Sequence, residues 1–183
     1  MRRQLMLIVF LLLGGGAQAF GWELPLNQWI ESGNGFWSCT RKCYHLGEDL
    51  RADTDDMVYA IGEGTVVDVS RRTRFGTVIL IEHETGDGHI VSLYGHLGRD
   101  DDSARIDDVF VAVGDTVNAG QEIGRIGDRD ENGDWPPHLH FGINRGAYRG
   151  DGSLCYGWEY AGYTADAYAE NDDCFCETLS EWL

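Results

Sequence analysis

The stretch GTVILIEHETGDGHIVSLYGHL, residues 76–97, decides the fold class of this chain. Its first part, GTVILIEH, is rich in β-branched residues, and the sequence GDG at residues 86–88 leads into the returning run HIVSLYGHL. Two apolar runs on either side of a glycine-containing turn are typical of a β-hairpin. The stretch therefore predicts two antiparallel strands joined by a tight turn.

The same kind of pattern extends in both directions along the chain. VYAIGEGTVVDVS at residues 58–70 alternates around two glycines, and residues 109–128 give short strands separated by Gly-Asp and Ala-Gly turns. HLHFGINR at residues 138–145 is the last clear strand. No segment carries a helical period over three turns. We expect an all-β domain, a two-layer antiparallel β-sandwich of hairpins.

The ends of the chain differ from this domain. Residues 1–19 carry two arginines, the apolar run LMLIVFLLL and the small residues AQA, a pattern that predicts a cleaved signal peptide, with a retained N-terminal anchor as the alternative. Residues 20–38 form a lead-in segment, and residues 39–145 form the domain. Residues 146–183 form an acidic, aromatic tail with three cysteines, whose last residues have the composition of a short helix.

The charge of the chain excludes several classes of partner. It has 14 basic and 31 acidic residues, a formal net charge of −17. Such a chain repels nucleic acid and anionic membranes, so we expect no nucleic-acid partner. We also expect no stable membrane span once the leader is removed, because the apolar run is too short. The sequence leaves the oligomeric state open.

The cysteines agree with export. The chain has five of them, Cys39, Cys43, Cys155, Cys174 and Cys176. An exported chain favours disulfides, and an odd number leaves at least one cysteine outside an intramolecular pair. The pairing stays open. The chain contains no C-x-x-C motif, which disfavours a cysteine-based zinc site.

Three short motifs contain the candidate site residues. In PPHLHF, the double proline places the start of a strand near His138, so that His138 and His140 face one way and Leu139 the other. Two imidazoles on one face suit a metal, although a polar strand face is the alternative. HLGED places His45 and Asp49 four residues apart around a turn at Gly47, and YGHL places a histidine at a strand end. Three ligands with spare imidazoles would suit catalytic zinc.

The set His-x-Gly-x-Asp, Tyr-x-His-Leu and Pro-His-Leu-His-Phe, in this order, resembles the lysostaphin-like (LytM-type) zinc metallopeptidases, which cleave peptide cross-bridges of bacterial peptidoglycan. The resemblance implies a periplasmic or secreted Zn²⁺ endopeptidase that acts on peptidoglycan peptides, with the zinc site in a groove of the β-sandwich. It implies zinc ligands at His45, Asp49 and His140, and catalytic histidines at His96 and His138. His83 and His89 match no functional position, and we expect them to be structural or exposed.

Several other features of the sequence bear on this interpretation. Trp135 and Pro136 stand where the family has small residues, which bears on substrate preference. DRDENGD at residues 128–134 begins like a calcium loop through Asp128, Asp130 and Asn132, but its twelfth position is leucine, so an acidic loop fits better. VGDTVNAGQEIGRIG also resembles the hairpins of biotin- or lipoyl-carrier domains, but those domains need a lysine at the turn, where this chain has Asn118-Ala119-Gly120. The chain also lacks the G-x-S-x-G motif of serine hydrolases. A non-catalytic regulator of wall hydrolases, or a secreted zinc peptidase acting on proteins, remains the alternative function.

Overall fold

A computed structural model describes residues 21–33, 35, 39–40, 43–98, 108–148 and 163–164 of the 183-residue chain. Over these residues the chain consists of strands and loops without a helix, which confirms the predicted all-β class. The same part of the chain therefore holds no apolar helix long enough to cross a membrane. The predicted leader, the three tail cysteines and the C-terminal helix lie outside the described residues. The strands are β1 (Cys39–Thr40), β2 (Cys43–His45), β3 (Glu48–Arg51), β4 (Met57–Tyr59), β5 (Gly64–Arg72), β6 (Gly76–Thr85), β7 (Gly88–Leu97), β8 (Thr116–Val117), β9 (Glu122–Arg125), β10 (His138–Arg145) and β11 (Tyr163–Thr164).

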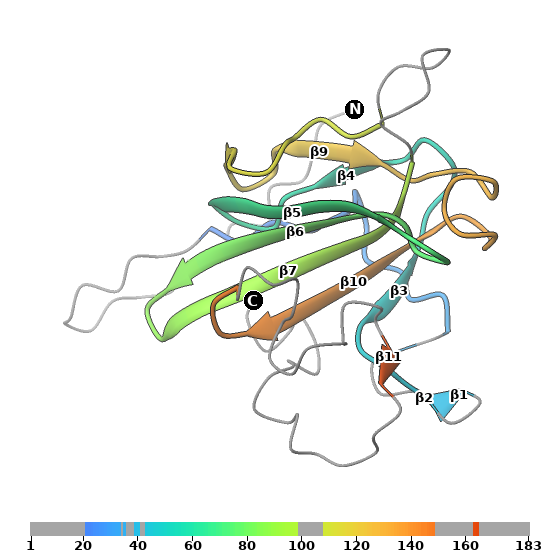
Figure 1. Cartoon of the computed structure of the whole chain (residues 1–183), viewed down its shortest axis with the longest axis horizontal. Coiled ribbons are helices and arrows are strands. Elements are labelled where there is room, and N and C mark those ends of the chain that lie inside the picture. Colours follow the sequence, from blue (N-terminus) through green and yellow to red (C-terminus); the bar gives the residue numbers. More distant parts are fainter. Residues whose placement is uncertain are drawn as a thin grey trace.

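The centre of the fold is a six-stranded antiparallel sheet in the order β3-β10-β7-β6-β5-β8. Figure 1 shows the long strands β5, β6, β7 and β10 side by side. The hairpin predicted from residues 76–97 is the pair β6 and β7, closed where Thr85 faces Gly88. β10 pairs with β7 on one side and with β3 on the other, which brings residues near position 49 beside residues near position 140.

The two faces of this sheet carry different side chains. Ile79 and Ile81 of β6 point into the main hydrophobic core, whereas Val78 and Leu80 point into a smaller cluster on the opposite face. This alternation is the period of two expected of a strand buried on both faces. The main core also includes Val58 of β4 and Ile123 of β9, so the two-stranded β4–β9 sheet forms the second layer on that face.

The segment 58–70, which alternates as if it were one strand, divides into two strands of different sheets. β4 belongs to the β4–β9 layer and β5 to the six-stranded sheet. The break occurs at the glycines. A Cβ at Gly62 would lie 2.4 Å from the Trp22 ring, and a Cβ at Gly64 would lie 2.5 Å from the carbonyl oxygen of Glu82. Only residues without a side chain allow these approaches, so here the glycines mark a crossing between layers.

Two further features fix the edge at which β3 lies. Residues 30–32 of the lead-in segment run beside β3, where Ser32 N–H donates to Asp49 O and Arg51 N–H donates to Ile30 O. Beyond this edge, β1, β2 and β11 form a separate three-stranded sheet, visible below β3 in Figure 1. The chain therefore passes from one sheet to the other between β2 and β3, and this crossing carries the HLGED motif.

Candidate metal centre

His45, Asp49 and His140 come from three strands that meet at the crossing between the two sheets. His45 is the last residue of β2, Asp49 lies on β3, and Asp49 and His140 are directly opposite each other in the β3–β10 ladder. Gly47 makes the bend between β2 and β3 close to β10. A Cβ there would lie 2.6 Å from the carbonyl oxygen of Phe141 and 2.7 Å from Nε2 of His140, so glycine is required by the close approach of two strands.

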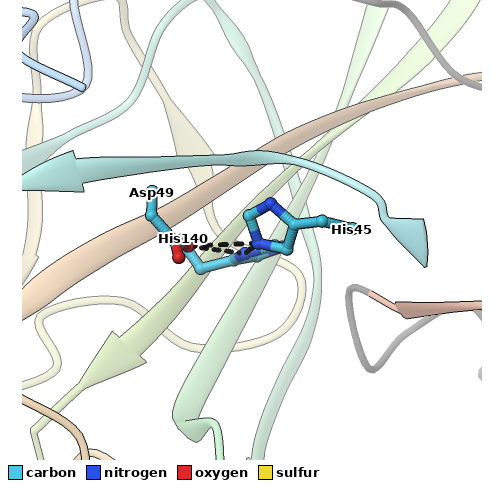
Figure 2. A group of neighbouring side chains, drawn as sticks. All are labelled: His45, Asp49 and His140. Atoms are coloured by element: carbon cyan, nitrogen blue, oxygen red, sulfur yellow. Dashed lines mark hydrogen bonds and ion pairs between the residues drawn. The ribbon is translucent and has the colours of Figure 1, made fainter. Parts of the chain in front are cut away.

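The three side chains point toward one another, as Figure 2 shows. Nε2 of His45 lies 2.9 Å from Nδ1 of His140, and each nitrogen lies 3.2 Å from Oδ1 of Asp49. All three side chains are buried, with at most 4% of each residue exposed. Within the described chain they are the one group of three or more His, Cys, Asp or Glu residues whose ligand atoms converge in this way.

The triangle of donor atoms fits a zinc ion. Ligands about 2.0–2.1 Å from a tetrahedral zinc are separated by about 3.3–3.4 Å. The three separations in the cluster, 2.9, 3.2 and 3.2 Å, are close to these values. Two nitrogens and a carboxylate oxygen are also a ligand set that zinc accepts, with a fourth position left for water or substrate.

The protonation states agree with this fit. Nδ1 of His45 lies 3.2 Å from the carbonyl oxygen of Gly35 and donates to it, which orients Nε2 of the ring toward the cluster. Burial lowers the pKa of His140 and favours its neutral form. Burial alone would raise the pKa of Asp49, but its hydrogen bonds and charge interactions with His140 and His45 together lower it below its usual range. The ionised Asp49 carboxylate and the neutral His140 imidazole are the forms that bind a cation.

His96 and His138 lie beside this cluster and beside each other. Their ring centroids are 4.1 Å apart, and Nε2 of His138 is 3.6 Å from Oδ1 of Asp49. Each ring is oriented by a backbone carbonyl: Nδ1 of His96 donates to Asn132 O at 2.7 Å, and Nδ1 of His138 donates to Pro136 O at 2.7 Å. In the neutral ring, this arrangement leaves the lone pair on Nε2. Burial, and secondarily the charge of His138, lowers the pKa of His96 to about 3.

The backbone of His96 is held in an uncommon conformation. Its φ is +67°, in the left-handed region that residues with a side chain seldom occupy. The β6–β7 register shifts between Thr77 and Ile79, directly opposite this position. A bulge of this kind redirects a side chain, and strain of about 1–3 kcal/mol at a single residue is typical of functional sites.

Phe75 contacts both a proposed catalytic histidine and a candidate metal ligand, a role that its sequence context does not predict. Its ring stacks on His96 at 5.1 Å with an interplanar angle of 14°, and it meets the edge of His140 at 5.4 Å. Phe75 precedes β6 and is 6% exposed, within the smaller hydrophobic cluster. An isolated phenylalanine before a strand reads as a core residue, because nothing in the local pattern shows that its neighbours in space are histidines.

The sequence also does not predict the role of Asn132 in orienting His96. Its backbone carbonyl orients His96, and its side chain closes the loop: Oδ1 accepts from Trp135 N–H, and Nδ2 donates to Trp135 O. The side-chain oxygen that a calcium loop would use is therefore already hydrogen-bonded within the protein. Asp128 accepts from the backbone of Asp130 at 2.9 Å. In the structure, the DRDENGD segment orients the His96 ring through the carbonyl of Asn132.

The two remaining histidines lie apart from the cluster. His83 is fully buried and hydrogen-bonded to Glu63 O and to the Ser92 hydroxyl, each at 2.8 Å. His89 is partly exposed at the opposite end of β7 from His96, where it pairs with Glu82 at 2.8 Å. Both positions agree with the expectation that these two histidines are structural or exposed.

Comparisons with known proteins agree with the geometry. Residues 43–151 match the model of peptidase family M23. The catalytic domain of the antimicrobial peptidase lysostaphin from Staphylococcus simulans is 26% identical, with a TM-score of 0.50 over 67% of this chain and 84% of that chain. Full lysostaphin is 27% identical, with a TM-score of 0.50 over 67% of this chain and 45% of that chain.

A zinc-containing peptidase from Vibrio cholerae is 29% identical, with a TM-score of 0.44. The match covers 55% of this chain and only 26% of that protein, so this chain spans about a quarter of the length of that relative. No curated protein sequence matches the chain.

Proposed function

The chain belongs to peptidase family M23, and on that premise we propose that it is an exported zinc metalloendopeptidase that hydrolyses peptide bonds in bacterial peptidoglycan cross-links. The observation that carries this proposal is the triangle formed by His45, Asp49 and His140, with His96 and His138 beside it. The likeness to the catalytic domain of an antimicrobial peptidase supports the substrate class. The leader-like residues 1–19 support export.

In this proposal His45, Asp49 and His140 hold the zinc. When bound, the ion would supply a Lewis acid that polarises the scissile carbonyl and lowers the pKa of a water molecule. The buried position of the three ligands excludes competing bulk water from their side of the site. Gly47 keeps β2 and β10 close enough for His45 and His140 to share one ion.

His96 and His138 are the proposed catalytic histidines. Because the Nδ1 proton of each is held by a backbone carbonyl, Nε2 of each is available to accept a proton from the attacking water. Once protonated, the same atom can donate a hydrogen bond to the developing oxyanion or a proton to the leaving amine. The Asp49 carboxylate, 3.6 Å from Nε2 of His138, would stabilise the positive charge during this step.

Purified peptidoglycan sacculi, small glycyl peptides and an unfolded protein substrate, tested side by side, would examine the proposal. We expect the zinc-loaded protein to release soluble peptides from sacculi, and the His138→Ala variant to release them at least about 100-fold more slowly. Cleavage of the protein substrate alone would show a peptidase of another class. Binding to sacculi without cleavage of any substrate would show a non-catalytic regulator.

A further inference from the structure

A second site candidate lies between the β5–β6 turn and the loop before β10. It is a pocket of about 710 Å³, within the size range of binding sites for small ligands. We call it the arginine pocket, since four of the residues that line it are arginines. Its lining is Arg71, Arg72, Thr73, Arg74, Arg129, Asp130, Gly133, Asp134 and Trp135.

The concentration of positive charge here runs against the composition of the chain. With 14 basic and 31 acidic residues, the chain nevertheless places four arginines around one pocket. Arg72 pairs with Asp68 at 3.2 Å and Arg129 with Asp134 at 2.8 Å. No ion pair joins Arg71 or Arg74 to an acidic side chain of the described residues, and both are exposed. Positive charges held together in this way favour an anionic ligand.

The pocket walls are held by backbone contacts. The indole N–H of Trp135 donates to Arg74 O at 3.0 Å, and the Arg71 guanidinium donates to Glu131 O at 3.0 Å. A Cβ at Gly133 would lie 2.2 Å from the backbone of Arg74, so the turn and the loop are in direct contact. Arg74 itself has a φ of +72°. The arginine side chains therefore project from a fixed frame, which lowers the entropy that a ligand must remove on binding.

The same two segments lead directly into the candidate metal centre. Arg74 precedes Phe75, whose ring stacks on His96. Trp135 lies three residues before His138, so their Cα atoms are at most about 11 Å apart. A peptide with its scissile bond at the histidines could thus reach the pocket with a side chain one or two residues away. Trp135 is 41% exposed, which leaves part of its ring available to such a peptide.

We propose that the arginine pocket binds a carboxylate of the peptide substrate close to the scissile bond, so that the enzyme prefers peptides with an acidic group there. This inference rests on the proposed function and names the substrate class of that site. A guanidinium fork matches a carboxylate in two parallel hydrogen bonds. Arg74 is the first candidate for this contact, because the Arg71 guanidinium already donates to Glu131 O. The net charge of −17 on the chain disfavours binding of an anionic peptide away from this pocket.

A matched pair of capped peptides tests the proposal by binding, separately from cleavage. The probes are acetyl-Ala-Glu-Ala-amide and acetyl-Ala-Gln-Ala-amide, which differ only in the carboxylate, added to the full zinc-loaded protein at low salt. The shift of the Trp135 indole resonance, assigned with the Trp135→Phe variant, reports occupancy. We expect the Glu peptide to bind about fivefold more tightly than the Gln peptide, and Arg74→Gln to abolish this preference.

Arg145→Gln is the control, because Arg145 is exposed at the far end of β10 from His138; it should keep the preference. Arg71→Gln provides a second variant if Arg74→Gln does not fold. Equal binding of the two peptides to the unaltered protein would overturn the proposal, as would a preference that survives both substitutions. Inorganic phosphate binding more tightly than the Glu peptide, in an Arg74-dependent manner, would show that the pocket serves phosphate instead. If the protein cleaves sacculi but binds both peptides equally, this inference alone is overturned. If it prefers the Glu peptide but cleaves no substrate, the proposed function alone is overturned.

Discussion

Two buried groups, one around His83 and one formed by His45, Asp49 and His140, show how a structural hydrogen-bond network differs from a candidate metal centre. His83 has a neutral partner for each ring nitrogen, Glu63 O and the Ser92 hydroxyl, and the network continues to the Tyr94 hydroxyl, which accepts from Ile61 N–H. At the other group, Nε2 of His45 and Nδ1 of His140 face each other and the same carboxylate oxygen. The first network is complete without a ligand, whereas the second brings together three atoms that all bind cations.

The largest expected effect comes from truncating one histidine of each group. His140→Ala should lose the zinc, about one ion per chain in the unaltered protein, because three protein ligands leave no substitute. His83→Ala should keep the zinc and instead lower the free energy of unfolding by about 1–3 kcal/mol, since it leaves the Ser92 hydroxyl and Glu63 O with one partner fewer. Metal analysis and denaturant unfolding of both variants measure the two effects. A full zinc content in His140→Ala would remove His140 from the ligand set. We expect His45→Ala and Asp49→Ala to lose zinc as His140→Ala does.

The next effect separates metal binding from catalysis within the site. His96→Ala and His138→Ala should bind zinc normally, because the Nε2 atoms of these residues complete no part of the donor triangle. Their cleavage of peptidoglycan should fall at least about 100-fold, the usual contribution of one general base or oxyanion donor. Zinc content and cleavage rate are measured on the same preparations, with His89→Ala as a control that should change neither. If His138→Ala lost its metal and His140→Ala retained it, the roles within HLH would be reversed.

A smaller effect should follow from the approach of β2 to β10. Gly47→Ala places a methyl group against Phe141 O and the His140 ring, so the two strands must separate. Because displacement of a supporting contact typically weakens metal binding 10- to 100-fold, we expect a zinc affinity about 10-fold lower. Competition with a chelator measures it. Gly86→Ala is the matched control, since a Cβ at that position has no atom within 4 Å. Unchanged zinc affinity in Gly47→Ala would show that the site tolerates a wider spacing.

The smallest effect concerns pH and belongs to the His83 network. Burial lowers the pKa of His83, so its stabilising contribution is full above about pH 6.5, the ordinary value. As the pH falls below 6.5, the unfolded chain binds a proton that the folded protein excludes, and the free energy of unfolding decreases by at most about 1.4 kcal/mol per pH unit. His83→Gln cannot titrate and should show a shallower slope between pH 6.5 and 5 than the unaltered protein. Equal slopes would show that His83 is readily protonated in the folded state.

Much of the fold could be predicted because strand patterns are local. The β6–β7 hairpin, the start of β10 at His138 and the shared face of His138 and His140 follow from a period of two, a glycine turn and two prolines. The same local pattern failed at residues 58–70, where one alternating run became two strands in different sheets. The alternation continues through the break, and only the packing of Trp22 against Gly62 reveals it.

The sequence by itself determined the class of fold, the residue types of the site and their order along the chain. The tertiary structure decided which of those residues meet: the β3–β10 register places Asp49 opposite His140, and the crossing at Gly47 adds His45. It also decided the parts supplied by Phe75 and by the carbonyls of Asn132 and Pro136, and the assembly of the arginine pocket. The physical reason is that backbone carbonyls are chemically alike at every position, and the register between distant strands depends on contacts that no short stretch contains.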